Sequence, residues 1–302
     1  MPTNSTIVRP LATHIALDTA AFDPDRIQLV THDLASHPLL QIEALRALVR
    51  RLPSSQVRFH ATTAGAATDF ERAPEQHRHH LGFEEALADI ESSGSWIALH
   101  NVQTDAAYKA LLDEVLDEVN VAIAPKDPGM FNRALWIFLQ SPHSITPFHM
   151  DHEDNFLLQI LGRKTARLWH PHDCLSDHSL EVFHAEFHRR EVTYQEEYDK
   201  HSRVFALGPG DGVYMPSTGP HLVTNLDNVS ITISMTYCTK STRRMETLNR
   251  ANHLLRRFGH APRAVGKSAL RDAVKYRVFQ AFYDTRSILR GQSRAIPEWA
   301  RH

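Results

Sequence analysis

Residues 146–169 read TPFHMDHEDNFLLQILGRKTARLW, and this stretch decides the fold. Three runs of mostly apolar or β-branched residues, at 146–151, 155–161 and 165–170, are separated by the short polar segments HED and GRK. Short runs that are bounded in this way are typical of β-strands joined by tight turns. The stretch therefore predicts three successive short strands.

The same pattern extends from this stretch in both directions. Its clearest further elements are the turn Gly208-Pro209-Gly210-Asp211 and the run VSITISMTY, which ends at residue 237. The candidate strands are Ala134–Gln140, Thr146–Asp151, Asn155–Leu161, Thr165–His170, Val204–Leu207, Gly212–Met215, His221–Asn225 and Val229–Tyr237. Eight short strands with tight turns predict a mainly β core, built as a sandwich or a barrel. The residues between 171 and 203 are predicted to form a long loop, such as a lid or an insertion.

The flanks of this β core have a different character. Residues 1–125 mix short strands with helices, and the clearest helix follows Asp105, a capping residue, with apolar positions at helical spacing as far as Val119. Residues 240–302 predict a helical hairpin with two apolar stripes, which must be buried against the core or a second copy. The chain thus divides into an N-terminal α/β region, a β core at 126–239 and a basic helical hairpin.

The composition of the 302-residue chain fits a packed globule, with 42% apolar and 23% charged residues. No run approaches the ~18–20 apolar residues that cross a bilayer, and the N-terminus lacks the pattern of a secretory signal. Two cysteines, Cys174 and Cys238, are too few for a disulfide framework or a cysteine-based zinc site. We expect a cytoplasmic protein that does not bind membranes.

The formal net charge of −2 hides an asymmetry along the chain. Residues 240–302 hold 15 Lys and Arg against 4 Asp and Glu, a net of +11, so the preceding residues carry −13. A basic end can attract an acidic partner or nucleic acid, or it can be the solvated surface of helices. Because no helix-turn-helix or zinc-finger pattern accompanies it, nucleic acid is not an expected partner.

Three residues of the β core are candidate metal ligands. If residues 146–151 form a strand, His149 and Asp151 point to the same face, because side chains alternate with period two. His221 follows the segment GDGVYMPSTGP, and a neighbouring strand can bring it to the same end of the core. Two imidazoles and a carboxylate on one face of a metal leave positions open for oxygen and a co-substrate, which is typical of non-haem Fe(II) oxygenases. The chain has 21 histidines, so the His-x-Asp pair without His221 would be a weak signal.

Lys164 lies thirteen residues after Asp151 and is a candidate for binding a diacid. A lysine in the wall of an apolar pocket is costly unless a carboxylate meets it, and the tail of 2-oxoglutarate would supply one. The hydroxyl of Thr146 can add a hydrogen bond to the same carboxylate. The alternative is that Lys164 is a solvated lysine beside Arg163.

The order of these residues resembles the Jumonji-C family of oxygenases. The shared order is Thr-x-x-His-x-Asp, then Asn-Phe, Gly-x-Lys, Gly-Asp-x-x-Tyr-x-Pro and a late His. Here these elements are Thr146, His149, Asp151, Asn155, Gly162, Lys164, Gly210, Asp211, Tyr214, Pro216 and His221. The sequence looks closest to factor-inhibiting-HIF-like asparaginyl hydroxylases and bacterial cupin-like relatives. The resemblance covers residues 133–239, about a third of the chain.

This resemblance implies a double-stranded β-helix of the cupin or jelly-roll type. It implies Fe(II) as the metal, 2-oxoglutarate as the co-substrate, and His149, Asp151 and His221 as the catalytic metal ligands. It also implies that the C-terminal helices form a homodimer, which suits the two apolar stripes.

The resemblance further implies which residues surround the co-substrate. Lys164 and Thr146 would bind 2-oxoglutarate, and Asn155 would lie close to it. Trp136 and Phe138 alternate on the first strand of the core and can line the same pocket, although both also fit an ordinary barrel core.

The implied reaction is that of a dioxygenase, which hydroxylates a C–H bond and releases succinate and CO2. At a carbon next to nitrogen the outcome would be oxidative demethylation. The substrate can be a protein side chain or a small molecule, and the residues His152, Glu153 and Asp154 depart from the nearest relatives at the expected mouth of the site. Two alternatives stay open: a non-catalytic cupin-type binding or regulatory protein, and a metal-dependent cupin enzyme that does not use 2-oxoglutarate.

Overall fold

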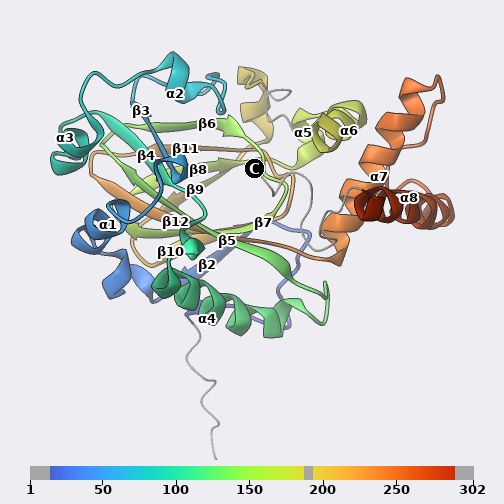
Figure 1. The fold of residues 1–302 in the computed structure, drawn as a ribbon, viewed down its shortest axis with the longest axis horizontal. Coiled ribbons are helices and arrows are strands. Elements are labelled where there is room, and N and C mark those ends of the chain that lie inside the picture. Colours follow the sequence, from blue (N-terminus) through green and yellow to red (C-terminus); the bar gives the residue numbers. More distant parts are fainter. Residues whose placement is uncertain (1–13, 187–192, 290–302) are drawn as a thin grey trace, which may run out of the picture.

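A computed structural model of the chain describes residues 14–186 and 193–289 (Figure 1). Among these residues the strands form one eight-stranded and one four-stranded sheet, and all pairings are antiparallel. The large sheet has the order β1 (Ile15–Ala16), β2 (Gln28–His32), β10 (Asp211–Met215), β7 (Asp154–Leu161), β12 (Ser230–Cys238), β5 (Phe131–Gln140), β4 (Ser95–Leu99) and β3 (Val57–Ala61). The small sheet has the order β6 (Ile145–His149), β11 (His221–Asn225), β8 (Lys164–Leu168) and β9 (Arg203–Leu207).

The two sheets stack as a jelly roll, which confirms the predicted mainly β core. From β5 to β8 the chain alternates between the large and the small sheet, and it does so again from β9 to β12. All eight predicted core strands are present, with ends shifted by a few residues. One shift matters for the site: the predicted strand 146–151 ends at His149, so Asp151 lies in the loop that follows β6.

The core of the molecule lies around the large sheet. Every residue of β4 and β12 is buried, so both faces of these strands are covered, although β12 alternates polar and apolar residues. Helix α4 (Ala106–Ile123) covers the outer face of the large sheet (Figure 1), and its apolar stripe shares one cluster with Leu135, Ile137 and Leu139 of β5. Asp105 accepts a hydrogen bond from the backbone NH of Ala107 at 3.0 Å, which confirms the predicted cap.

The N-terminal region extends the large sheet at both edges, because β2 pairs with β10 and β4 pairs with β5. Strand β3 was not predicted, since its sequence VRFHA joins a polar segment with few apolar residues. Besides α4, the helices of the N-terminal region are α1 (Ile42–Val49), α2 (Ala73–Gln76) and α3 (Phe83–Ala88). The same region has 3₁₀ turns at Leu34–Ser36, Pro38–Leu40, Ser54–Gln56 and Val102–Thr104. The division of the chain at residue 125 stays a prediction.

The segment between β8 and β9 differs from the predicted long loop. It contains α5 (Pro171–Cys174), α6 (Asp177–Glu186) and a 3₁₀ turn at Glu196–His201. The sequence DHSLEVFHAE of α6 has few apolar residues, which is why its helical pattern was missed. Phe183 of α6 is buried and stacks on His152 with a 3.9 Å separation of the ring centroids, so the insertion packs next to the loop that carries Asp151.

The C-terminal hairpin consists of α7 (Lys240–Arg257) and α8 (Ala269–Leu289) and projects from the sheets (Figure 1). Helix α7 packs against α6, and Arg256 pairs with the buried carboxylate of Glu181 at 2.5 Å. Of the described helices, none is long and apolar enough to cross a bilayer.

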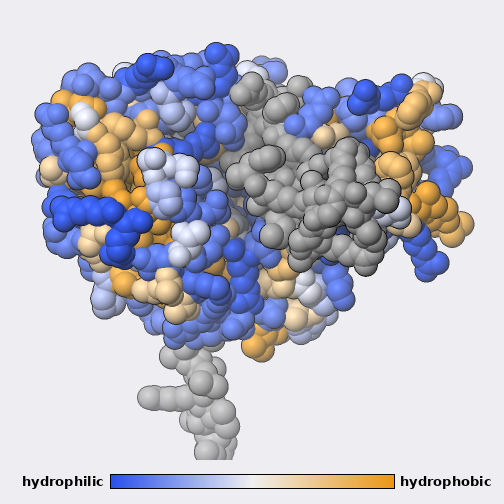
Figure 2. Space-filling view, in the orientation of Figure 1, coloured by the Kyte–Doolittle hydropathy of each residue, from blue (hydrophilic) through white to orange (hydrophobic). Residues whose placement is uncertain are grey.

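The two apolar stripes of the hairpin have different environments. Leu248 of the first stripe is buried, whereas Phe258 at its end is 74% exposed. On the second stripe Leu270, Val274 and Val278 are 77%, 57% and 59% exposed, so burial of this stripe against the core is wrong. Figure 2 shows apolar residues on the surface of this projecting part.

Gly162 lies in the tight turn between β7 and β8, which sets the start of the strand carrying Lys164. Its φ is +74°, and a Cβ atom there would lie 2.1 Å from the carbonyl oxygen of Val229. Because both backbone strain and a steric clash oppose a side chain, we expect Gly162→Ala to lower the free energy of unfolding by about 2–4 kcal/mol. Urea unfolding followed by circular dichroism measures this change.

Gly65→Ala is the matched control, because nothing lies within 4 Å of a Cβ atom at Gly65. We expect this control to change the stability by less than about 1 kcal/mol. Equal losses in the two variants would contradict the role of the Gly162 turn.

Candidate metal centre and the adjoining cavities

The three predicted metal ligands converge at one end of the small sheet. Strands β6 and β11 are neighbours, and His149 lies directly opposite His221 in their register. The ring centroids of the two histidines are 4.1 Å apart, and Asp151 Oδ2 is 3.8 Å from His221 Nε2. One ligand atom from each residue lies within 4.8 Å of the other two. The structure therefore brings the predicted ligands together although Asp151 lies beyond the strand.

Both imidazoles are oriented by backbone carbonyl groups. His149 Nδ1 is 2.7 Å from the carbonyl oxygen of Pro147, and His221 Nδ1 is 3.0 Å from that of Gly219. A carbonyl oxygen can only accept, so each Nδ1 carries the proton and each Nε2 keeps its lone pair. Such contacts are the usual support of metal-binding histidines.

The loop that carries Asp151 is held by the segment after β10. The backbone NH of Thr218 donates to the carbonyl oxygen of Asp151 at 2.8 Å, and Ser217 Oγ donates to that of His152 at 2.8 Å. The backbone NH of Ser217 also donates to Asp154 Oδ1 at 3.0 Å. The Asp154 carboxyl is buried, and mainly for this reason its pKa is raised from 3.8 to about 7. These bonds fix the direction in which the Asp151 carboxylate leaves the backbone.

A first cavity, called the inner cavity below, extends from the candidate metal centre into the barrel. Its lining residues are Phe138, Thr146, His149, Asp151, Asn155, Leu157, Lys164, His221, Val223 and Ser234. Lys164 is only 2% exposed, so the alternative of a solvated lysine is wrong. The predicted co-substrate residues Lys164, Thr146 and Asn155 thus line one cavity together with all three candidate ligands.

The ammonium group of Lys164 lacks a countercharge within the described chain. Lys164 Nζ donates to Gln140 Oε1 at 3.3 Å, and desolvation without any compensating carboxylate lowers the pKa of Lys164 to about 7. A buried amine of this kind is costly to the fold unless an anion meets it. The inner cavity therefore has the character of an anion site.

Thr146 adds a second donor to the same cavity. Its Oγ1 accepts hydrogen bonds from Trp96 Nε1 and from Gln140 Nε2, both at 3.0 Å. Two accepted bonds occupy the lone pairs of the hydroxyl, which leaves its own proton to be donated. Thr146 and Lys164 are thus joined through Gln140 into one small donor network.

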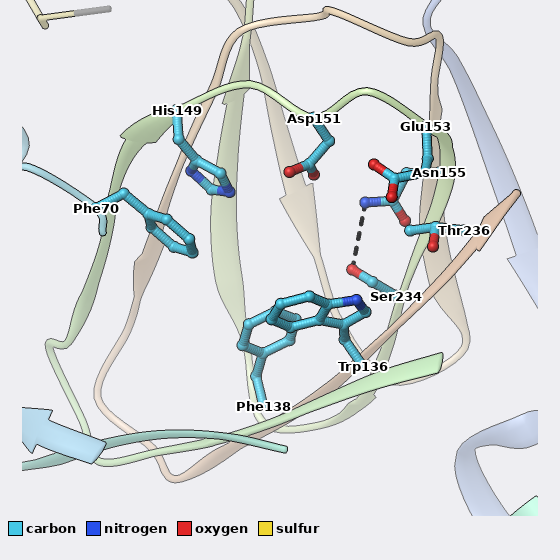
Figure 3. Close-up of a pocket in the computed structure, with 9 residues that line it drawn as sticks. All are labelled: Phe70, Trp136, Phe138, His149, Asp151, Glu153, Asn155, Ser234 and Thr236. Carbon is cyan, nitrogen blue, oxygen red and sulfur yellow. Dashed lines mark hydrogen bonds between the residues drawn. The ribbon is translucent and has the colours of Figure 1, made fainter. Parts of the chain in front are cut away.

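A second cavity, called the outer cavity below, adjoins the inner cavity and shares part of its lining (Figure 3). Its lining residues are Phe70, Trp136, Phe138, His149, Asp151, Glu153, Asn155, Ser234 and Thr236. Trp136 lines this cavity and is not among the residues around Lys164. Five residues line both cavities: Phe138, His149, Asp151, Asn155 and Ser234. Asn155 Nδ2 donates to Ser234 Oγ at 3.3 Å, a bond drawn in Figure 3.

Several residues of the site were missed by sequence reasoning. Phe70 stacks on His149 with ring centroids 4.0 Å apart, but it comes from a segment that carries no periodic signal. Gln140 is a buried polar residue at the end of the apolar run ALWIFLQ, and this polar position was the available signal. Ser234 belongs to the polar row of β12, which alternates with apolar residues, and this alternation was the available signal.

A second group of candidate ligands among the described residues lies at the surface. His14, Glu114 and Glu118 also bring ligand atoms within 4.8 Å of one another. His14 Nδ1 already contacts Asp33 Oδ1 at 2.7 Å, and Glu114 is 61% exposed. Ion pairing at the edge of α4 explains this group without a metal.

Sequence comparison defines the class of protein to which this fold and site belong. A family model described as the cupin-like domain matches residues 30–243. The chain therefore belongs to the cupin-like domain family. This confirms the predicted cupin-type resemblance, while the predicted closeness to factor-inhibiting-HIF-like hydroxylases stays a prediction.

The solved structures that resemble the chain are remote. The ribosomal oxygenase YcfD from Escherichia coli in complex with cobalt and 2-oxoglutarate shares 18% identity at a TM-score of 0.43, over 85% of this chain and 63% of that one. The complex of YcfD with cobalt and succinic acid shares 16% identity at a TM-score of 0.42, over 91% of this chain and 65% of that one. The DMSP lyase DddQ from Ruegeria pomeroyi DSS-3 shares 17% identity at a TM-score of 0.23, over 35% of this chain and 38% of that one. The chain thus spans less than two thirds of the length of YcfD.

The buried amine makes the stability of the protein depend on pH. The pKa of Lys164 is lowered from 10.5 to about 7, so between these pH values the unfolded chain binds a proton that the folded chain does not. Stability therefore rises with pH across this window. Between pH 7 and pH 9 we expect Lys164 to add about 2 kcal/mol to the free energy of unfolding.

Urea unfolding at pH 7 and pH 9, without added carboxylates, measures this contribution. The rise should be smaller by that amount in Lys164→Met than in the wild type. The control Lys109→Met, which changes an exposed lysine of α4, should keep the wild-type rise. An identical pH dependence in the wild type and Lys164→Met would contradict the assignment.

Proposed function

We propose that the chain is an Fe(II)- and 2-oxoglutarate-dependent oxygenase. It hydroxylates, or oxidatively demethylates, a protein side chain or a small molecule, and it releases succinate and CO2. The observation that carries the proposal is the buried ammonium of Lys164, which faces a cavity shared with two imidazoles and a carboxylate. A cavity of this kind calls for a ligand that is both a metal chelator and an anion.

The donor set fits a ferrous ion. Two neutral imidazole Nε2 atoms and the Asp151 carboxylate can occupy one face of an octahedral metal and leave three positions for other ligands. With 2-oxoglutarate and oxygen, the iron centre supplies the oxidation of unactivated C–H bonds. His149, Asp151 and His221 would hold this metal.

The inner cavity fits the far end of 2-oxoglutarate. Lys164 and Thr146 would donate to its distal carboxylate, and the resulting ion pair offsets the cost of burying the amine. Leu157 and Val223 give the same cavity apolar walls, which keep water away from the bound diacid. A cupin enzyme that does not use 2-oxoglutarate would have no use for this ammonium.

We also propose a cytoplasmic location, as predicted from the sequence. Cys174 and Cys238 are both free thiols, and a reducing compartment preserves thiols. Ferrous iron is likewise kept reduced there.

Anaerobic titration with Fe(II) and 2-oxoglutarate tests the proposed function. We expect a visible absorption band from the chelate in the wild type and its loss in His149→Ala. Lys164→Met should weaken 2-oxoglutarate binding by about ten- to one-hundredfold, because a charge-assisted hydrogen bond is lost. In air, the wild type should convert 2-oxoglutarate to succinate.

Controls for this titration are His172→Ala and Lys109→Met, whose wild-type side chains are 57% and 59% exposed. Both should keep the wild-type band and affinity. A wild-type protein that gives neither the band nor succinate would remove the assignment and leave a metal-dependent cupin of another kind or a binding protein.

We further propose that the protein is a homodimer formed through the second stripe of the hairpin. Leu270, Val274 and Val278 follow one another at intervals of four residues and are more than half exposed, so a second copy would bury a continuous apolar face. We expect Val274→Glu to convert a dimer to a monomer in sedimentation velocity. The control Val204→Glu changes an equally exposed valine on β9 and should remain dimeric. A monomeric wild type at micromolar concentration would contradict this interface.

A further inference from the structure

We infer that Phe70 is a positioning residue of the candidate metal centre, because its ring stacks on the imidazole of His149 and favours the metal-bound form of that ligand. This inference rests on the proposed function, since it concerns the metal that His149, Asp151 and His221 would hold. It goes beyond that function because Phe70 lies between β3 and α2, outside the β core that carries the three candidate ligands.

The two rings form a close and nearly parallel stack. Their centroids are 4.0 Å apart, and their planes differ by only 5°. Both side chains are buried, and Figure 3 shows the ring of Phe70 next to the imidazole of His149 in the lining of the outer cavity. The carbonyl oxygen of Pro147 holds the Nδ1 atom of the same imidazole. The imidazole is therefore kept in one orientation before a metal binds, which lowers the entropic cost of binding.

Strand β3 and the turn around residue 70 hold the ring of Phe70 in place. Arg58 of β3 donates to the carbonyl oxygen of Glu71 at 3.1 Å and pairs with its carboxylate at 2.9 Å. The carboxylate of Asp69 accepts a hydrogen bond from the backbone NH of Glu71 at 2.9 Å. The guanidinium carbon of Arg58 is 5.1 Å from the centroid of the Phe70 ring, and Trp96 packs perpendicular to that ring at 6.1 Å. These contacts fix Phe70 independently of His149.

The strength of the stack depends on the charge of the imidazole. With a divalent ion on Nε2, the imidazole of His149 loses electron density and gains positive character. The face of an aromatic ring is negative and attracts a cation, so the contact with Phe70 is more favourable in the metal-bound state than in the free state. A contact that differs between two states shifts the equilibrium between them. Phe70 therefore raises the affinity of the site for a metal.

Calorimetric titration of Mn(II) into metal-free protein tests this inference. Phe70→Leu keeps an apolar side chain but removes the ring, and we expect it to weaken Mn(II) binding by about three- to tenfold. Phe70→Tyr keeps the face of the ring and should retain the affinity of the wild type.

A fluorinated ring separates the electrostatic effect from packing. Phe70→pentafluorophenylalanine keeps an aromatic ring of similar shape but reverses the sign of the charge on its face. We expect this replacement to weaken Mn(II) binding as Phe70→Leu does. A ring that only fills space would instead leave the affinity unchanged.

The stack itself can be observed in the metal-free protein by nuclear magnetic resonance. The ring protons of His149 should resonate upfield, because the face of the Phe70 ring shields them, and they should move downfield in Phe70→Leu. The variant His149→Gln assigns these signals by their loss. Ring protons of His149 that do not move in Phe70→Leu would contradict the stack.

The matched control is a second stack of the same kind in the N-terminal region. Phe59 of β3 stacks on His79 with ring centroids 4.7 Å apart, and His79 is not one of the candidate ligands. Phe59→Leu therefore removes a ring from a histidine without touching the site. We expect it to keep the wild-type affinity for Mn(II).

Failure of this inference differs from failure of the proposed function. A wild type that binds Mn(II), with the same affinity in Phe70→Leu and Phe59→Leu, overturns the inference alone. So does wild-type affinity in the pentafluorophenylalanine variant. A wild type that binds neither Mn(II) nor Fe(II) would instead overturn the proposed function.

Discussion

The pairing of β6 with β11 is the constraint on which the site depends. It places His149 opposite His221, and β8 holds β11 in turn from its other side. Side chains of a strand alternate between faces, so a slip of one residue in either pairing would turn one imidazole away from the cavity. The backbone pairing of the small sheet thus places two of the candidate ligands next to each other. The third, Asp151, needs a separate support, which Thr218 supplies from the loop after β10.

Burial gives the site its chemical character and also its energetic cost. Lys164, Gln140 and Thr146 are polar groups deep within the barrel, and they are joined in one hydrogen-bonded network. The apolar cluster around the large sheet must outweigh the desolvation of this lysine for the chain to fold without a ligand. In a fold whose other buried residues are apolar, polar residues that are buried together are typical of a functional site.

Sequence patterns predicted those parts of the structure that depend on local periodicity. Helical spacing identified the buried stripe of α4. His149 and Asp151 were also expected to lie together, but Asp151 reaches His149 from the loop after β6 and not through alternation along a strand. Patterns failed where burial depends on distant segments: Phe70 reaches His149 from another part of the chain, and the partly polar α6 is held by contacts with α7. The stripe of α8 shows the same limit, since an amphipathic pattern predicts that a face is covered but not by which molecule.

The stacking of Phe183 on His152 has a mechanical consequence. His152 is the backbone neighbour of Asp151, and Phe183 belongs to α6, which Arg256 of α7 holds through Glu181. A continuous chain of packed side chains therefore runs from the projecting hairpin to the candidate metal ligand. Packed interiors resist compression and transmit displacement. A force that displaces the hairpin would thus also shift the backbone beside Asp151, although the hairpin and Asp151 lie in different parts of the molecule.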